Sequence, residues 1–298
     1  MSPVVRKASH AGSWYSADRE KLNSQLQKWL SDVTINRHSA RAVISPHAGY
    51  DYSGPCAAFS FKQIDPRHIK RVFVLGPAHY MSLRNKCALS TADLFETPFY
   101  SIPIDRNVFQ ELSKTGEFTD LPLSRDEEEH SIEMQMPYVA KVMEGYQGRY
   151  TVVPILVGYL TPDREAVYGQ IFSQYLSNPE NFFVISSDFC HWGKRFQYTY
   201  YDQSKGAIWQ SIQALDETGM QIIERLAPSE FSSYLEQYGN TICGRHPIGV
   251  LLQTIASLRT KMPNGRFDLK FIQYAQSEHC NNMNQSSVSY ASAVLQIS

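Results

Sequence analysis

Residues 182–191 read FFVISSDFCH, an apolar run that stops at two serines and is followed by a histidine. The same order occurs in AVISPH at residues 42–47 and in VFVLGPAH at residues 72–79. A short, continuous apolar run bounded by turn residues is typical of a strand buried on both faces of a sheet. Pro46 and Pro77 prevent further ladder pairing where two of these runs end. We therefore predict three buried strands, each followed by a histidine.

The order of elements along the chain predicts an α/β fold. Apolar runs predict further strands at 151–157, 267–274 and 288–297, the last two as an antiparallel pair at the sheet edge, and apolar residues at helical spacing predict helices between the strands. Because strands and helices alternate, we expect a three-layer α/β/α sandwich with a central, mostly parallel sheet. Ligands of such sheets bind at the carboxyl ends of the parallel strands, so the three histidines are expected to converge on one crevice. No Gly/Ser-rich linker interrupts the chain, and we expect a single domain over residues 1–298.

Capping residues predict where several helices begin. Asp105 is expected to cap a helix, and Thr161 with the following proline predicts another. Ser131 is expected to cap a helix over 132–143, and Pro247 to start a long apolar helix.

Composition and charge exclude several classes of protein. Lys and Arg number 28 and Asp and Glu 29 among 298 residues, and this near-neutral balance gives no support for nucleic-acid binding. The longest apolar stretch, 150–160, is too short to span a bilayer. The five cysteines contain no C-x-x-C pair, and no signal peptide is evident. We expect a reducing, cytoplasmic environment, with the nucleus as a second compartment.

His47 and His79 form the first candidate site. Both follow a predicted buried strand and lie in loops rich in Gly, Ala and Pro. Imidazole is the commonest metal ligand, and rigid strand ends hold ligands well. The alternative is a pair of loop histidines that hydrogen-bond to the backbone.

Asp188 and His191 form the second candidate site. A carboxylate and an imidazole three residues apart can serve as a base and its orienting group, or as metal ligands. Alternatively, Asp188 caps a turn and His191 packs beside Trp192.

Cys243 and His246 form the third candidate site, in a polar turn before the predicted helix at Pro247. A helix N-terminus stabilises a thiolate, and Arg245 favours a functional interpretation. An unreactive buried cysteine and a helix-capping histidine are the alternatives. His130 and Glu133 are a weaker pair, because His130 follows three glutamates that we expect to be solvated.

No P-loop, GxGxxG or GxSxG motif is present to suggest nucleotide binding or serine-hydrolase chemistry. Seven other segments are distinctive: ASHAGSWY (8–15), PHAGY (46–50), LGPAH (75–79), EHSIE (129–133), SSDFCHWG (186–193), NTICGRHPIG (240–249) and SSVSY (286–290). Through these segments the chain resembles the Memo family (mediator of receptor-driven cell motility) over nearly its whole length.

The resemblance implies the fold of the catalytic subunits of class III extradiol dioxygenases, which are non-heme iron enzymes. It implies metal ligands at His47, His79 and Cys243, with copper or iron as the metal and redox activity, and acid/base residues at Asp188 and His191. The dioxygenases use two histidines and a carboxylate, whereas a thiolate ligand favours Cu(I), Zn or thiolate-bound Fe. The resemblance therefore implies metal-dependent redox activity and little catechol cleavage.

Three functional hypotheses follow from the residues and the resemblance. The first is an intracellular copper- or iron-binding redox protein that acts in receptor tyrosine kinase signalling, cell motility and cytoskeleton control. The second is a non-catalytic adaptor whose vestigial dioxygenase pocket receives a phosphotyrosine-containing receptor peptide, with Lys194 and Arg195 placed to meet the phosphate. The third is a surviving small-molecule dioxygenase.

Overall fold

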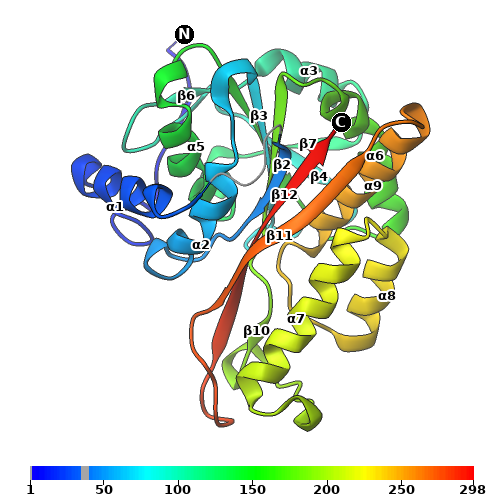
Figure 1. Cartoon of the computed structure of the whole chain (residues 1–298). Helices are drawn as coiled ribbons and strands as arrows, with labels where there is room; N and C mark the ends of the chain where they lie inside the picture. The colour runs from blue at the N-terminus through cyan, green and yellow to red at the C-terminus, as the bar shows by residue number, and fades with distance from the viewer. Residues whose placement is uncertain (1, 35–39) are drawn as a thin grey trace.

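The structure is a computed structural model that describes residues 2–34 and 40–298 (Figure 1). A large sheet forms its centre and holds nine strands among these residues. The strands lie side by side in the order β10 (His191–Trp192), β12 (Ser287–Ile297), β2 (Ala40–Ser45), β9 (Asn181–Ser186), β3 (Arg71–Pro77), β8 (Thr151–Val157), β4 (Cys87–Ser90) and β7 (Phe118–Leu121), and β11 (Phe267–Gln276) pairs with β12.

The sheet is parallel at its centre and antiparallel beside that centre. Strands β2, β9, β3 and β8 are mutually parallel neighbours, whereas β12 runs antiparallel to β2 and β4 runs antiparallel to β8. The expectation of a mostly parallel sheet is therefore wrong, and the sheet is mixed. The pairing of β11 with β12 follows from their connection. The loop between these two strands is too short for the crossover that a parallel pair needs, so they pair antiparallel.

Helices cover both faces of the sheet. Figure 1 shows α1 (Arg19–Ser31), α2 (Tyr50–Lys62) and α5 (Met136–Val142) on one side, and α6 (Pro162–Ser177) and α9 (Arg245–Lys261) on the other. The predicted helix–sheet–helix layering is thus present.

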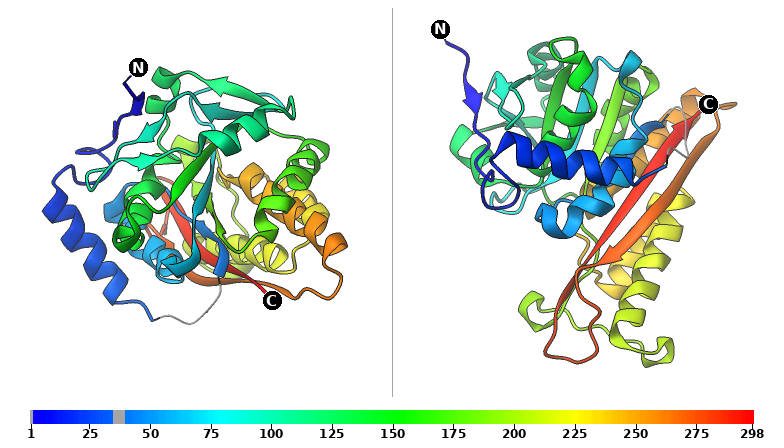
Figure 2. Two further views of the ribbon diagram at one scale, coloured as in Figure 1. Left: turned by 90° about the horizontal axis from the view of Figure 1, so that it is seen from above. Right: turned by 60° about the vertical axis from the view of Figure 1, so that its left-hand side comes forward.

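The remaining elements lie around these layers. In Figure 2 the β11–β12 hairpin extends beyond the body of the molecule, next to α7 (Ile208–Glu224). The other helices are α3 (Arg106–Ser113), α4 (Leu123–Glu128) and α8 (Pro228–Tyr238). A small separate sheet consists of β1 (Val5–Arg6), β5 (Leu94–Phe95) and β6 (Ile102–Pro103). No helix in the described ranges is both long and apolar enough to cross a membrane.

Two of the predicted caps are present and one is absent. Asp105 accepts a hydrogen bond from the Val108 amide at 3.1 Å, and Thr161 accepts one from the Arg164 amide at 3.4 Å. Ser131 caps no helix, because its hydroxyl donates to the Pro77 carbonyl at 2.8 Å. The helix begins instead at Met136, where the proline that follows lies in the first turn and its missing N–H costs no hydrogen bond.

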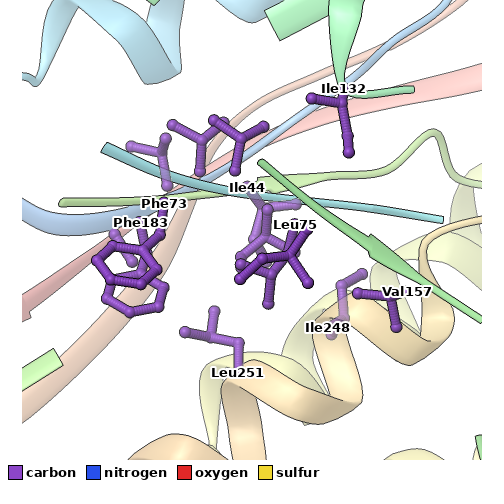
Figure 3. Packing of buried hydrophobic residues seen from close by; sticks show 14 of the residues in the cluster. Ile44, Phe73, Leu75, Ile132, Val157, Phe183, Ile248 and Leu251 are labelled. Atoms are coloured by element: carbon purple, nitrogen blue, oxygen red, sulfur yellow. The ribbon is translucent and has the colours of Figure 1, made fainter. Parts of the chain in front are cut away.

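The central strands are buried on both faces. Figure 3 shows Ile44, Phe73, Leu75 and Phe183 close to Leu251 of α9. The Phe73 and Phe183 rings stack with centroids 4.6 Å apart. Fully burying a side chain of this size contributes about 1.5–3 kcal/mol, so this packing fixes the strand ends and the loops that follow them.

Candidate metal centre

The loops after β2, β3 and β9 bring the predicted histidine and carboxylate residues together. These strands are adjacent and parallel, so their carboxyl ends lie at one edge of the sheet. The rings of His47 and His79 have centroids 5.3 Å apart, and Cys243 Sγ lies 3.2 Å from His47 Nε2. Residues far apart in the sequence therefore form one cluster.

His47 is buried and held in one orientation. Its Nδ1 lies 2.8 Å from Ser186 Oγ, which leaves Nε2 facing the Cys243 sulfur. Burial and, next, the nearby His79 lower the pKa of His47 well below its usual value. The ring is therefore neutral at physiological pH, which is the form that binds metal ions.

His79 is oriented by a carboxylate that the sequence did not suggest. Its Nδ1 lies 2.9 Å from Glu129 Oε1, and its backbone amide donates to Glu129 Oε2 at 2.6 Å. A carboxylate behind a histidine in this way is the usual support of a metal ligand, because it fixes the ring and raises its basicity. Burial alone would lower the pKa of His79, but hydrogen bonds to Cys243 and Glu129 raise it to about 10.

Glu129 is buried, although the sequence suggested a solvated side chain. It is 3% exposed, and it also accepts the amides of His130 and Ser131 at 2.9 Å each. Burial alone would raise the pKa of Glu129, but the hydrogen bond from His79 and its charge hold it at about 2. The side chain is thus a carboxylate that holds His79.

Cys243 precedes α9 and points into the same cluster. Its Sγ accepts a hydrogen bond from the Asp188 amide at 3.3 Å. Burial raises the pKa of the Cys243 thiol, although a hydrogen bond from His79 opposes this. A thiol in this position loses its proton when it ligates a metal.

His130 is a third imidazole in the cluster, although its sequence context indicated only a weak candidate site. Its ring stacks on His79 with centroids 4.5 Å apart and lies 5.4 Å from His47. It is buried, and its Nδ1 has no hydrogen-bond partner among the described residues. Burial and, next, His47 and His79 lower its pKa to about 3. The sequence signals for His130 were its spacing from Glu133 and its place in the EHSIE segment.

Asp188 combines the two interpretations that the sequence left open. Its Oδ1 accepts the backbone amides of His47 at 2.8 Å and Ala48 at 3.3 Å, so it caps the loop after β2. It also belongs to a possible ligand set with His47 and Cys243, in which the donor atoms lie within 4.8 Å of one another. The three histidines His47, His79 and His130 form a second such set.

His191 lies beside the cluster with one nitrogen occupied. Its Nδ1 is 2.9 Å from the Phe189 carbonyl and 3.1 Å from the Thr241 carbonyl. Carbonyl oxygens only accept hydrogen bonds, so Nδ1 carries a hydrogen and Nε2 is the free basic nitrogen. This arrangement suits a proton acceptor.

Lys194 and Arg195 are exposed and lie just beyond β10. Lys194 Nζ donates to Asn284 Oδ1 at 3.0 Å, and the Arg195 guanidinium lies 4.4 Å from the Phe196 ring centre. Phe196 in turn contacts the His191 ring. Arg195 is therefore separated from His191 by the Phe196 ring, whereas Lys194 points to Asn284.

A cavity of about 710 Å³ opens next to His79. Its lining includes Arg84 and the exposed rings of Tyr80 and Tyr159, but neither Lys194 nor Arg195. Arg84 is a cation at this edge of the sheet that the sequence analysis did not identify.

His246 is not the helix cap, because Gly244 occupies that position in α9. Its Nδ1 lies 2.8 Å from Glu165 Oε1 of α6 instead. His246 therefore joins two helices and lies outside both ligand sets.

Comparisons with known proteins find relatives that match this chain over almost its whole length. The profile of the family described as Memo-like protein matches residues 6–294. "Protein MEMO1" of Homo sapiens is 53% identical over 294 residues, covering 99% of this chain and 98% of that protein. The Xenopus laevis protein of the same name is 54% identical, covering 98% of this chain and 97% of that protein, and the Caenorhabditis elegans "Protein memo-1 homolog" is 48% identical, covering 98% and 82%.

Among solved structures, an uncharacterized protein of Escherichia coli K12 matches with a TM-score of 0.48 and 9% identity, covering 84% of this chain and 99% of that chain. The family assignment depends on the sequence matches alone. These matches span almost the whole chain, and about half of the aligned residues are identical. This chain belongs to the Memo family.

Proposed function

We propose that this chain is a copper- or iron-binding redox protein that acts in receptor tyrosine kinase signalling, cell motility and cytoskeleton control, in the cytoplasm and also in the nucleus. The observation that carries the metal proposal is the convergence of His47, His79 and Cys243 at one sheet edge. The signalling part depends on the resemblance to the Memo family.

The donor set fits a transition metal. Ser186 and Glu129 occupy the Nδ1 atoms of His47 and His79, so the Nε2 atoms are the ones that would bind a metal, His79 after losing its Nε2 proton. Two imidazoles and a thiolate favour copper or iron over hard cations such as Mg²⁺ and Ca²⁺. When bound, such a metal would supply one-electron exchange with oxygen species. His191 would accept or return protons through Nε2, and Asp188 would hold the His47 loop in place.

Metal analysis of protein purified without added metal tests this proposal. Cys243→Ser should lose most of the copper or iron, and the His47→Ala/His79→Ala double variant should lose it completely. Cys56→Ser is the matched control, because Cys56 is a buried thiol that hydrogen-bonds to Ser292 instead of joining the cluster. Equal metal content in the wild type and the double variant would refute the proposal.

A second candidate function is recognition of a phosphotyrosine-containing receptor peptide. The cavity beside His79 supports it, because Tyr80 and Tyr159 offer aromatic surface and Arg84 offers a cation for a phosphate. Arg195 is the second cation to test. Calorimetry should show tighter binding of a phosphorylated receptor peptide than of its unphosphorylated form, and Arg84→Gln and Arg195→Gln should reduce that difference. Equal affinity for the phosphorylated and unphosphorylated peptides would refute the proposal that the phosphate group is recognised.

The third candidate function is catechol cleavage, and it depends on a more specific proposal about the fold. We propose that residues 1–298 form one domain with the fold of class III extradiol dioxygenase catalytic subunits. The resemblance implies a thiolate, that of Cys243, where those enzymes use a carboxylate ligand, so we expect little ring cleavage by the iron-loaded protein. Anaerobic loading with iron(II), followed by catechol and air, tests this. A yellow ring-cleavage product that disappears in His191→Ala would favour the enzyme.

A further inference from the structure

A second cleft lies at the opposite edge of the sheet from the metal centre. Its volume is about 770 Å³, within the range of small-molecule sites. The residues that line it precede or begin the four central parallel strands: Ala40 and Arg41 at β2, Asp65 to Lys70 before β3, Tyr146 and Arg149 before β8, and Pro179, Glu180 and Phe182 at β9. The cleft therefore lies at the amino ends of these strands, where the metal cluster does not reach.

The charges in this cleft are unbalanced. Four cations line it, Arg41, Arg67, Lys70 and Arg149, against two carboxylates. Asp65 pairs with Arg67, and Glu180 pairs with Lys70. No carboxylate pairs with Arg41 or Arg149 in the described ranges, so two guanidinium charges remain uncompensated.

Arg41 gives a second, independent sign of a missing anion. One of its terminal nitrogens donates to the Leu176 carbonyl, but its Nε is buried and has no hydrogen-bond partner among the described residues. Burying part of a guanidinium without an acceptor costs free energy. An anion in the cleft would supply the acceptor and offset the cost.

The cleft also has an apolar wall. Ile69 and Phe182 are buried, and Tyr146 is half-buried beside them. This wall offers contact for a ring or another apolar group next to the two guanidinium groups. Guanidinium groups bind phosphates through paired hydrogen bonds, and a phosphate monoester dianion matches two surplus positive charges.

We propose that the amino-edge cleft binds a phosphate monoester with a planar or apolar body, of about the size of a nucleoside monophosphate. Arg41 and Arg149 bind the phosphate, and the wall of Ile69, Tyr146 and Phe182 contacts the body of the ligand. The site is independent of the metal centre and of the function proposed for it.

Titration calorimetry with AMP as the probe tests this site, with adenosine and inorganic phosphate as partial ligands. We expect AMP to bind more tightly than either one. Arg149→Gln should weaken AMP binding by about tenfold or more, because a charge-assisted contact is lost. The Arg41→Gln/Arg149→Gln variant should weaken it further. Arg225→Gln is the matched control, because Arg225 is an exposed arginine that pairs with Glu230 and lies outside the cleft.

Two measurements keep the test decisive. Arg149 is exposed, so Arg149→Gln should keep the wild-type melting temperature even if the Arg41 substitution lowers it. Metal content should stay at the wild-type level in Arg149→Gln, and AMP binding should persist in Cys243→Ser. No binding of AMP, equal binding of adenosine and AMP, or loss of AMP binding in Arg84→Gln but not in Arg149→Gln would each overturn the proposal.

Discussion

Two buried polar clusters meet at residues 126–133, and they differ in how their polar atoms are satisfied. In the first, Arg6 is fully buried and pairs with Glu133 and Asp126, and it donates to the carbonyls of Asp126 and Glu129 at 2.8 Å each. Glu133 also accepts the Tyr15 hydroxyl at 2.8 Å. Cations face anions, and donors face acceptors, except at Asp126 Oδ2, which makes no hydrogen bond in the described ranges.

The metal cluster lacks this balance. Three imidazoles, a thiol and one carboxylate converge in it, and His130 Nδ1, which lies 3.4 Å from Glu129 Oε1, makes no hydrogen bond in the described ranges. Buried polar atoms are nearly always satisfied in native structures, so atoms left converging on one another indicate a ligand. The charges of the Arg6 cluster are thus paired within it, whereas the metal cluster is a set of converging potential ligands.

Glu129 connects the two clusters. Its carbonyl accepts a hydrogen bond from Arg6, and its carboxylate holds His79. The ion pair of Arg6 with Glu133 therefore supports the backbone that positions a metal ligand. Three predictions test this contrast and one tests a separate buried carboxyl group, Asp216, and the four follow in order of decreasing effect.

The largest effect is expected from Arg6→Met. The substitution leaves Glu133 buried without its cation, and breaking a buried pair in this way costs about 3–5 kcal/mol of folding free energy. Urea unfolding measures the loss. A loss of unfolding free energy below about 1 kcal/mol in Arg6→Met would show that Arg6 does not neutralise a charged Glu133 in the folded protein.

The second prediction concerns Asp216, which is buried among Asn240, Ser289 and Tyr274. Burial raises the pKa of Asp216 to about 6, although hydrogen bonds from those three residues oppose the shift. The folded protein thus holds this proton more tightly than the unfolded chain, so the stabilisation is present below pH about 4 and is lost as the pH rises to about 6.

Asp216→Asn keeps the shape of the side chain and cannot titrate. The stability of the wild type relative to this variant should therefore fall by about 2–3 kcal/mol between pH 4 and pH 6 in urea unfolding experiments. Parallel stability curves for the two proteins would show that Asp216 does not titrate in this window.

The third prediction places Glu129 in the metal cluster. Glu129→Gln removes the charge behind His79, and loss of such a supporting carboxylate weakens metal binding by about 10–100-fold. Competition with a chelator measures this. Glu128→Gln is the control, because Glu128 is exposed and pairs with Arg125. Equal metal affinity in the two variants would contradict the assigned role.

The smallest effect is expected from Lys7→Ala. Lys7 neighbours Arg6 but forms an exposed pair with Glu96 at 3.2 Å, and such pairs contribute about 0–1 kcal/mol. Thermal unfolding should separate Lys7→Ala from Arg6→Met clearly. Similar losses would mean that burial does not decide the contribution of these adjacent cations.

The sequence by itself determined the local elements of this protein. The three apolar runs are strands β2, β3 and β9, and Asp105 and Thr161 cap helices as expected. The seven motifs carried the resemblance to the Memo family, which the comparisons confirm. Strand and helix periods, caps and strand ends depend on neighbours in the chain, so local residues reveal them.

Only the tertiary structure decided which distant residues meet. The sequence contains Glu129 within an acidic run and Arg6 in an unremarkable N-terminal stretch, and nothing local shows that one orients His79 and the other forms a buried ion pair. The antiparallel pairing of β11 with β12 was expected, but only the tertiary structure placed β12 antiparallel beside β2 and β4 antiparallel beside β8, which makes the sheet mixed. The reason is physical: whether a charged side chain is solvated, paired or aimed at a ligand depends on what packs over it, and those groups come from elsewhere in the chain.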